Sequence, residues 1–585
     1  MEKIYNTLVN INSIGNTITL EGWVAKKRNL GGLIFIDLRD RTGIIQLVVR
    51  PENKNYELAS NLKNEYVIKA IGKVVERESK NPNIPTGDIE VEVETLEVLN
   101  TCEELPFTID DNTNALEDTR LKYRFLDIRR NKLKENLFLR NEVLHFLRNK
   151  MYDNGFIEVQ TPILTASSPE GARDFVVPSR NFKGKFYALP QAPQIYKELL
   201  MVGGFEKYFQ IAPCFRDEDP RADRTLEFYQ LDLEMSFCTE DDVLNVGEEI
   251  FYDTFTKFSN KKVSPRPFRR ISYNDAINLY GTDKPDLRYD MLIQDITDIF
   301  KNTEFTVFKN VIEEKGIINA IVVKNAADKY SRKNLDSLTE LVKERKASGL
   351  AYIKYNEEVT GSIVKVLSEE EITNIKNKLN IENNDLVLVV SGNKKIVKSA
   401  LGAVRCKVAE EMNLIDNSRL ELCIINDFPM FEYDDTLNKW DFCHNPFSLP
   451  HGGIDAYNTK NYEDILAYQF DFVCNGNEMA SGAIRNHDLD SLAKGFEIVG
   501  YSREEVEQRF KSIFTAFKYG CPPHGGMAPG IDRILMLIQD EPNLREVQAF
   551  PPSASGQDLM MGSPSSLTDI QLKELGIKFE KNNDW

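Results

Sequence analysis

Alternation of hydrophobic and polar residues is the main feature of the first part of the chain. Short apolar segments bounded by turn residues lie, in order, at 18–24, 33–39, 44–50, 65–75 and 88–98. In the second segment Ile34, Ile36 and Leu38 share one face, because successive side chains of a strand point to opposite sides. A stretch of helical character, 55–62, separates the third segment from the fourth. The pattern predicts five half-buried strands and one helix.

This order of strands and helix is typical of a small closed barrel of the OB type. Phe35 falls on the polar face of its strand, and Gln46 and Arg50 share one face of the next strand. The loop 26–28 before the second strand is cationic and includes Arg28. An exposed ring beside an amide and cations is typical of a surface on which single-stranded bases stack. The segment alone also admits a surface phenylalanine among ordinary charges.

The rest of the chain changes pattern several times. A charged stretch follows the barrel, and from Asn136 the apolar residues Val143, Leu147 and Met151 recur at helical spacing. A Lys- and Glu-rich segment that opens after GTDKPDLR interrupts the second domain. The predicted parts are a barrel, a hinge, a first part of the second domain, an insertion, a second part of that domain and a C-terminal extension, at 1–105, 106–135, 136–287, 288–420, 421–565 and 566–585.

Composition narrows the class of protein. The chain has 585 residues, of which 42% are hydrophobic and 28% charged, which excludes fibrous and disordered classes. It lacks both an apolar run of the roughly 18 residues that a membrane helix needs and a signal-peptide or transit-peptide start. The eight cysteines form no CxxC pair, which argues against a zinc ribbon or a disulfide framework. We therefore expect a cytoplasmic protein without a membrane partner.

The net charge bears on nucleic-acid binding. A formal charge of -18 argues against an electrostatic grip on nucleic acid by the whole molecule. Any such contact must depend on a local basic surface.

Candidate chemistry is concentrated in residues 208–237. Alternation places Gln210, Arg216 and Glu218 on one face of a first strand, and Phe228, Gln230, Asp232 and Glu234 on one face of a second. The polar loop between them predicts an antiparallel hairpin with an exposed polar face. That face holds too many different polar groups for an ordinary surface and indicates a ligand site.

Three further segments carry groups suited to a ligand. PEGARDF and QAPQIYKELL contain Glu170, Gln194 and Lys197, the last two three residues apart near a helix start. NGNEMASGAIRNH places Glu478 and Arg485 around small residues. In HGGMAPGIDRILMLI a glycine-rich turn leads into a helix with an arginine, an arrangement that suits a phosphate but is also common without one.

Together these segments resemble the signature motifs of a class II aminoacyl-tRNA synthetase. Motif 1 matches the helix 141–154 and the strand that ends at Pro162, motif 2 matches FRDE and RTLEF, and motif 3 matches GMAPGIDR. The barrel, LKYRFLDIRR, PEGARDF, QAPQIYKELLM and the insertion after GTDKPDLR resemble the bacterial-type aspartyl-tRNA synthetases over about residues 16–565. The insertion is similar to their GAD domain.

The resemblance implies a multidomain α+β fold: an OB-fold barrel, a catalytic domain built on an antiparallel sheet flanked by helices, and an inserted α+β domain. It implies that L-aspartate is activated with ATP and Mg²⁺ to aspartyl-adenylate and then passed to the 3′ end of tRNA(Asp). Some members of this family also charge tRNA(Asn), and Leu30 and Asn81 favour the strict type here. A homodimer is implied because motif 1 forms the subunit contact in most of the class.

The resemblance also implies roles for residues at matching positions. The catalytic residues would be Arg216, Glu478 and Arg533. ATP would contact Arg216, Glu218, Phe228, Glu478, Gly530, Ile531, Asp532 and Arg533. Aspartate would contact Glu170, Gln194, Lys197, Arg216, Asp232, His444 and Arg485. The metal ligands would be Asp471 and Glu478. The anticodon would be read by Arg28, Phe35, Gln46, Asn81 and Glu90.

Charge decides the expected amino acid. Arg485 offers a planar fork and Lys197 a point charge for a substrate carboxylate. A lysine-specific pocket should be acidic where Arg485 stands, and the insertion is not expected in the asparaginyl type. A non-catalytic RNA-binding paralogue is the alternative from another class, and the retained motif residues argue against it. One departure from the family stands at Asn445, where a second histidine usually follows His444.

Overall fold

The computed structural model describes residues 2–167, 172–434, 437–459 and 461–579. The chain forms two compact units, Met1–Ala115 and Leu116–Trp585, which we describe separately. In the described residues no helix is both long enough and apolar enough to cross a membrane.

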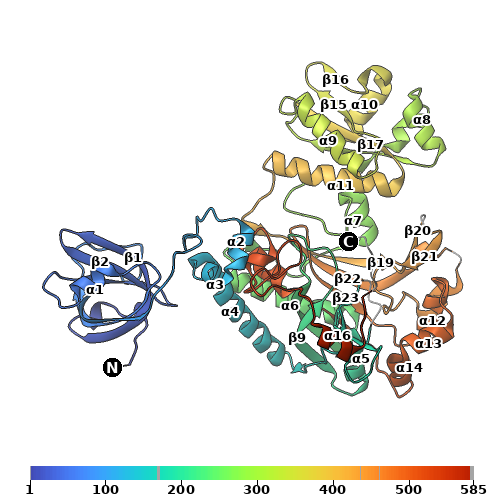
Figure 1. Cartoon of the computed structure of the whole chain (residues 1–585). Helices are drawn as coiled ribbons and strands as arrows, with labels where there is room; N and C mark the ends of the chain where they lie inside the picture. Colours follow the sequence, from blue (N-terminus) through green and yellow to red (C-terminus); the bar gives the residue numbers. More distant parts are fainter. Residues whose placement is uncertain (1, 168–171, 435–436, 460, 580–585) are drawn as a thin grey trace. The chain divides into compact units, whose positions relative to one another are not determined.

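The first unit is the predicted barrel (Figure 1). Its strands close in the order β1-β2-β3-β5-β4, and the single parallel pair is β3 with β5. The bounds are β1 (Thr17–Leu30), β2 (Leu33–Arg39), β3 (Ile44–Val49), α1 (Tyr56–Asn61), β4 (Val67–Glu76) and β5 (Ile89–Asn100). Leu20, Ile36, Leu47 and Ile68 fill the interior, as the alternation predicts.

The second unit is built on an eight-stranded sheet of order β12-β19-β22-β23-β24-β10-β9-β6. All of its pairs are antiparallel except β12 with β19 and β6 with β9. In that order the strands span Arg269–Ser272, Leu422–Pro429, Leu466–Cys474, Asn477–Ile484, His524–Met527, Glu227–Ser236, Lys207–Phe215 and Ile157–Glu158. The predicted hairpin is β9 with β10, in which Phe215 pairs with Glu227.

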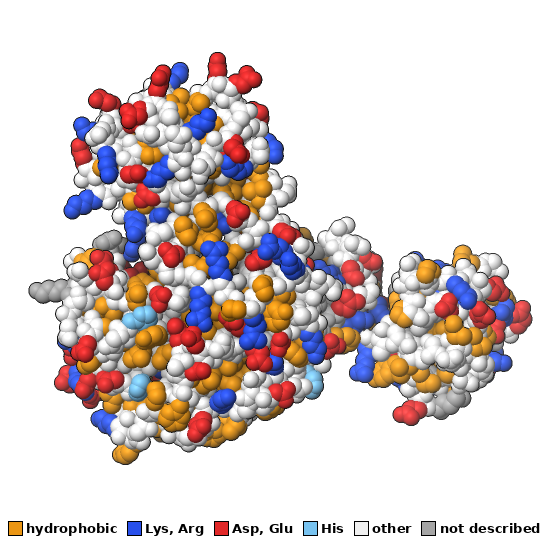
Figure 2. All heavy atoms as spheres, turned by 180° about the vertical axis from the view of Figure 1, so that it is seen from behind, with side chains coloured by type: hydrophobic (Ala, Val, Ile, Leu, Met, Phe, Trp, Pro, Cys, Tyr) orange, Lys and Arg blue, Asp and Glu red, His pale blue; other side chains and the backbone are white. Residues whose placement is uncertain are grey.

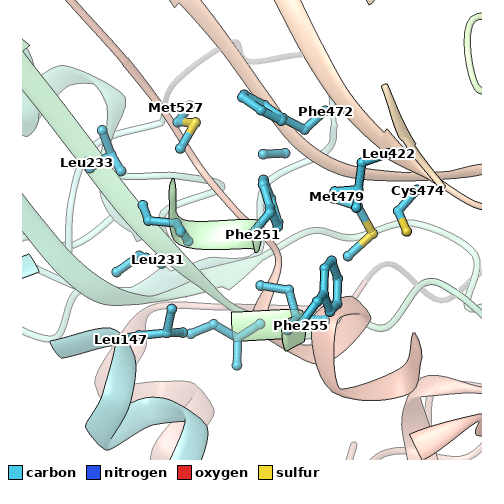
Figure 3. Close-up of a cluster of buried hydrophobic side chains, with 14 of the residues drawn as sticks. Leu147, Leu231, Leu233, Phe251, Phe255, Leu422, Phe472, Cys474, Met479 and Met527 are labelled. Carbon is cyan, nitrogen blue, oxygen red and sulfur yellow. The ribbon is translucent and has the colours of Figure 1, made fainter. Parts of the chain in front are cut away.

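Helices α4 (Asn131–Asp153), α6 (Glu240–Phe258) and α15 (Ile531–Gln539) cover one face of this sheet. Figure 3 shows Phe251 and Phe255 of α6 among Leu231, Leu233 and Met527 of the strands. The stripe Val143, Leu147 and Met151 of α4 is fully buried in the same core. Because this chain itself covers the stripe, the stripe gives no argument for a second subunit.

The segment after GTDKPDLR forms its own five-stranded sheet, β13-β14-β17-β15-β16, which is packed with helices. Its elements are β13 (Gln294–Asp295), α8 (Thr306–Glu313), β14 (Ile317–Val323), α9 (Arg332–Glu344), β15 (Ala351–Tyr355), β16 (Val359–Gly361), α10 (Glu369–Lys378), β17 (Asp385–Gly392) and α11 (Lys394–Glu411). The domain limits proposed from the sequence stay a prediction.

A buried arginine of α11 ties the insertion to the segment that leads into it. Arg405 donates from Nη2 to the backbone oxygens of Asp286 (2.9 Å) and Tyr289 (3.0 Å), and from Nε to that of Met291 (3.1 Å). These hydrogen bonds fix the backbone from Asp286 to Met291, which begins two residues after Lys284.

Shorter elements complete the second unit. They are α2 (Glu117–Lys122), α3 (Arg124–Asp127), β7 (Val176–Pro178), β8 (Phe186–Ala188), α5 (Gln194–Val202), β11 (Lys262–Val263), α7 (Tyr273–Tyr280), β18 (Arg419–Leu420), β20 (Phe431–Asp434), β21 (Lys439–Phe442), α12 (Leu489–Ile498), α13 (Arg503–Arg509), α14 (Lys511–Phe517) and α16 (Asp569–Leu575).

Candidate active site

A cavity of about 540 Å³ opens on the face of the sheet where β10 and β23 lie near α5 and the start of α15. Most of the residues that the sequence assigned to ligands line it: Gln194, Lys197, Arg216, Glu218, Phe228, Asp232, His444, Glu478, Arg485, Gly530, Asp532 and Arg533. Glu170 lies outside the described residues. The hairpin, the QAPQIYKELL segment and motif 3, which are distant in sequence, therefore meet at one cavity.

The sequence suggested that the polar face of β10 is exposed, and this expectation was wrong for the second half of the strand. Phe228 and Gln230 are half-buried and line the cavity. Asp232 and Glu234 are both fully buried. The reason is that α5 covers this face and places Lys197 on it, with Nζ 2.8 Å from Asp232 Oδ1 and 3.3 Å from Glu234 Oε2. Burial raises the pKa of Asp232, although Lys197 opposes the shift. The ion pairs of Lys197 with Asp232 and Glu234 thus stabilise charges that water would otherwise solvate.

Arg485, the residue that follows β23, forms a buried fork with Glu234. Nε donates to Oε1 at 2.9 Å and Nη2 donates to Oε2 at 3.1 Å. Burial alone would raise the pKa of Glu234, but Arg485 and Lys197 lower it to about 2. A Cβ atom at Gly526 would lie 2.2 Å from Glu234 Oε2, so the glycine of motif 3 makes room for this pair. Sequence analysis gave Glu234 no role, because its partner is 251 positions away.

At the end of the cavity where the sequence predicts a nucleotide, Arg216 lies over the ring of Phe228, with its guanidinium carbon 5.0 Å from the ring centroid. Arg533 donates to the backbone oxygen of Glu478 at 2.6 Å. Glu218 pairs with Arg224 of the motif 2 loop at 3.1 Å. A flat ring under a cation, with a second arginine nearby, can accept a purine and its phosphates.

The start of α15 differs from the expected phosphate cradle. Gly530 N–H donates to Met479 O at 2.8 Å and so is already used. The Asp532 carboxylate accepts from Tyr229 N (3.2 Å), from Gln548 Nε2 (3.2 Å) and from Arg140. Ile531 is buried in the core, outside the cavity wall. This segment anchors the helix, and Gly530 and Asp532 also line the cavity.

Two acidic residues on neighbouring strands form the candidate metal site. Asp471 Oδ2 is buried and, among the described residues, without a hydrogen-bond partner. Burial and the charge of Glu478 raise the pKa of Asp471 well above its ordinary value. Burial would also raise the pKa of Glu478, but Lys284 and Arg533 lower it. Groups of three or more His, Cys, Asp or Glu side chains arranged for a metal are not found in the described ranges.

Lys284 was missed by sequence analysis. It belongs to GTDKPDLR, lines the cavity and places Nζ 3.0 Å from Glu478 Oε2. The segment had been interpreted only as the opening of the insertion. A cation beside Glu478, in a cavity that Arg216 and Arg533 also line, can balance charge on a polyphosphate.

The loop with His444 also borders the cavity. His444 Nε2 lies 3.9 Å from Asp471 Oδ2, and burial lowers the pKa of this histidine. Asn445 Oδ1 accepts from Phe447 N at 2.9 Å, and Asn445 O accepts from Gln469 Nε2 at 2.8 Å. Asn445 thus stabilises the turn in addition to lining the cavity.

The barrel holds a separate polar cluster. Arg28, opposite Phe35 on the neighbouring strand, donates to Asp37 (2.7 Å) and to Gln46 (3.2 Å). Gln46 donates to Glu90 at 2.6 Å and accepts from Arg77 at 2.9 Å.

Four of the five predicted anticodon residues therefore lie around one face. The fifth, Asn81, lies in the β4–β5 loop and accepts from Asn83 N at 3.1 Å. Sequence analysis did not identify Arg77. This residue directly follows β4, and the alternation along that strand gives no sign that Arg77 contacts Gln46.

A barrel joined to an antiparallel sheet, with Arg216 on a hairpin and Arg533 on the following motif, defines a class II aminoacyl-tRNA synthetase. The family model for tRNA synthetases class II (D, K and N) matches residues 116–554, and that for the OB-fold nucleic acid binding domain matches 18–99. The chain belongs to the class II (D, K and N) synthetase family.

Similar proteins match nearly the whole chain. The Aspartate--tRNA(Asp/Asn) ligase of Rickettsia canadensis (strain McKiel) is 49% identical over 577 residues, covering 97% of this chain and 96% of that protein. The protein of the same name from Phenylobacterium zucineum (strain HLK1) is 50% identical over 570 residues, covering 96% of each.

Solved structures share the fold. An asparaginyl-tRNA synthetase from Pyrococcus horikoshii complexed with asparaginyl-adenylate has a TM-score of 0.58 at 21% identity, covering 94% of this chain and 98% of that one. An aspartyl tRNA synthetase from Entamoeba histolytica has a TM-score of 0.56 at 18% identity, covering 94% of this chain and 91% of that one.

Proposed function

We propose that this protein is an aspartate–tRNA ligase that forms aspartyl-adenylate from L-aspartate and ATP and then aminoacylates tRNA. One observation carries the proposal: Arg485 and Lys197 are buried in the wall of a cavity that Arg216 and Phe228 also line. A site with two buried cations suits an amino acid with a second carboxylate. The full-length similarity to Aspartate--tRNA(Asp/Asn) ligases supports the same choice.

The first step needs no enzyme nucleophile. The α-carboxylate of aspartate attacks the α-phosphorus of ATP in line, the bond to the β,γ-phosphates breaks, and pyrophosphate leaves. Arg216 neutralises the charge between the two reactants, Phe228 stacks on adenine and Glu218 accepts from the adenine edge. Arg533 holds the γ-phosphate. Catalysis consists of positioning and charge stabilisation.

Selection of aspartate follows from the paired cations. Glu234 holds the Arg485 fork in one orientation at 2.9 and 3.1 Å, so the guanidinium presents its remaining N–H groups to the side-chain carboxylate. Lys197 adds a positive charge, while Gln194, Asp232 and Glu170 accept from the substrate ammonium. The side-chain amide of asparagine carries no negative charge for Arg485 and Lys197 to bind, and these two cations repel the ammonium of a lysine side chain.

Asp471 and Glu478 fit a Mg²⁺ ion, because a buried carboxylate oxygen without a partner is a ready oxygen ligand. Phosphate oxygens of ATP and water would complete its shell. When bound, the ion offsets the negative charge of the phosphates. The ammonium of Lys284 lies 3.0 Å from Glu478 Oε2 and competes with the ion for this carboxylate.

The second step passes the aspartyl group to the terminal ribose of tRNA, and the barrel selects the tRNA. On the face shown in Figure 2, acidic and basic side chains are interspersed. Recognition therefore depends on local groups, with Phe35 as the stacking surface and Arg28, Gln46 and Glu90 beside it.

We propose that the enzyme charges both tRNA(Asp) and tRNA(Asn), because the names of the relatives describe both activities. The two positions that favoured the strict type give little support in the structure. Leu30 is exposed, and Asn81 stabilises a turn. Charging purified tRNA(Asp) and tRNA(Asn) side by side tests this choice, and a negligible rate on tRNA(Asn) would restore the strict interpretation.

We further propose a twofold homodimer in the cytoplasm. Phe125, Phe138, Tyr152 and Ile157, on or next to the motif 1 elements, are exposed apolar side chains. Sedimentation at micromolar concentration should give twice the chain mass of 67.0 kDa. A monomer under those conditions would refute the dimer.

The decisive test of the enzyme is ATP–pyrophosphate exchange measured with each amino acid in turn. We expect exchange that depends on L-aspartate and Mg²⁺. Exchange driven by asparagine or lysine instead would overturn the assignment of the pocket.

A further inference from the structure

A buried histidine lies behind the amino-acid pocket and is used by none of the steps above. His524, the first residue of β24, is 0% exposed. Its Nδ1 is 2.8 Å from Pro522 O and its Nε2 is 3.1 Å from Glu198 Oε2. Because both ring nitrogens face acceptors, both carry protons and the ring is an imidazolium. Burial opposes this charge, but hydrogen bonds to Cys521 and Glu198 raise the pKa of His524 to about 10.

The partner of this imidazolium connects it to the pocket. Glu198 is 1% exposed, and its second oxygen, Oε1, accepts from Gln194 Nε2 at 2.6 Å. Both residues lie on α5, one turn apart. An ionised carboxylate only accepts hydrogen bonds, so the Gln194 amide must turn its nitrogen toward Glu198. Its oxygen, Oε1, then lies on the opposite side of the amide.

That oxygen is free for a ligand. Gln194 lines the cavity beside Lys197 and Asp232. Among the described residues, Gln194 Oε1 accepts no hydrogen bond. A substrate ammonium at this end of the cavity needs an acceptor of this kind, whereas a flipped amide would present two N–H groups and repel it.

We propose that Glu198 and His524 are positioning residues of the amino-acid site, which lock the Gln194 amide with its oxygen toward the substrate ammonium. The inference rests on the proposed function, because it assumes an amino acid in this cavity. His524 holds Glu198 ionised in the protein interior, and Glu198 fixes Gln194. Neither residue touches the substrate.

The test compares two ligands that differ only in the ammonium. Succinate is aspartate without its amino group, so it needs the cations of the site but not Gln194. Glu198→Met removes the hydrogen bond that holds the Gln194 amide in this orientation. We expect the KM for L-aspartate in ATP–pyrophosphate exchange to rise at least 10-fold, while the Ki of succinate as a competitive inhibitor and the KM for ATP stay within twofold. Met201→Leu, on the same face of α5 and equally buried, is the matched control and should change none of them.

Two further variants keep the test decisive if Glu198→Met folds poorly or succinate binds too weakly. The double variant Glu198→Met with His524→Leu removes both buried charges together, which proteins tolerate better than the loss of one. Gln194→Met should raise the KM for aspartate by itself, and adding Glu198→Met to it should cause no further rise.

An unchanged KM for aspartate, an equal loss of aspartate and succinate binding, or multiplying effects of the Gln194 and Glu198 variants would each overturn the inference. Failure of the proposed function is seen separately, since the wild-type protein would then show no aspartate-dependent exchange.

Discussion

Arg485 and Glu234 join the end of β23 to β10 through two parallel buried hydrogen bonds of 2.9 and 3.1 Å, since Arg485 directly follows that strand. The pair means that the cation expected to bind the substrate carboxylate is already held by a carboxylate of the protein. Glu234 therefore aims the guanidinium, and the cost of burying each charge is offset by the other. Changes at Arg485 should consequently affect stability as well as specificity.

Arg485→Leu should abolish aspartate-dependent exchange, with a loss of at least about 100-fold, or about 2.7 kcal/mol. It should also lower the free energy of unfolding by about 3–5 kcal/mol, because Glu234 loses its main buried partner. Arg485→Lys should lose comparable activity with a smaller loss of stability, since the charge stays but the fork does not. Exchange assays and urea unfolding measure the two effects.

Arg503→Leu, a change of a partly exposed arginine on α13, serves as the control and should alter neither property. Aspartate-dependent exchange at wild-type rates in Arg485→Leu would refute the role of this residue.

The barrel and the hairpin could be predicted from sequence because each is a set of strands with one buried face. Ile34, Ile36 and Leu38 are all buried, and Phe215 does pair with Glu227. A period of two in the sequence gives the strand, its buried face and its neighbour across a short loop. This information is local, and the prediction succeeded where local information was enough.

The pairing of charges inside the site was beyond sequence analysis. Glu198 meets His524 across 326 positions, and Lys284 meets Glu478 only once the segment that leads into the insertion is folded against the cavity. The polar face of β10 had been expected to be exposed because its alternation cannot show that α5 covers it. The resemblance to a family supplied the candidate ligand residues, while their partners within the protein came from the structure.

Phe35→Ala should weaken aminoacylation of tRNA by roughly 5- to 150-fold, because stacking of a base on an aromatic ring contributes about 1–3 kcal/mol. Aspartate-dependent exchange without tRNA should be unchanged, since the barrel is a separate compact unit. Leu58→Ala, which changes an exposed side chain of α1 in the same barrel, should leave both reactions intact. A parallel fall in exchange would show that the variant damages more than tRNA recognition.

Lys284→Met should lower the Mg²⁺ concentration that gives half-maximal exchange by a few-fold. The ammonium lies 3.0 Å from Glu478 and competes with a metal ion for that carboxylate, so its removal strengthens the attraction of the site for a divalent cation. A Mg²⁺ titration at fixed ATP and aspartate measures the change. Lys407→Met, at a lysine paired with Glu410 on the surface of α11, is the comparison. An increased Mg²⁺ requirement would show that Lys284 assists binding of the metal–nucleotide complex.

Stability should fall as the pH rises from 7 to 10, in part because of His524. Its pKa is raised from the ordinary value of 6.5 to about 10 in the folded chain, so its contribution is complete below pH 6.5 and is lost as the pH approaches 10. A tenfold difference in proton affinity between the folded and unfolded chain corresponds to about 1.4 kcal/mol, so a fall of more than that amount is expected across this range. Glu198→Met with His524→Leu removes both members of the buried pair and should flatten this part of the profile. Urea unfolding of the two proteins at several pH values, with the substrates absent, measures the difference, and parallel profiles would show that His524 is neutral in the folded protein.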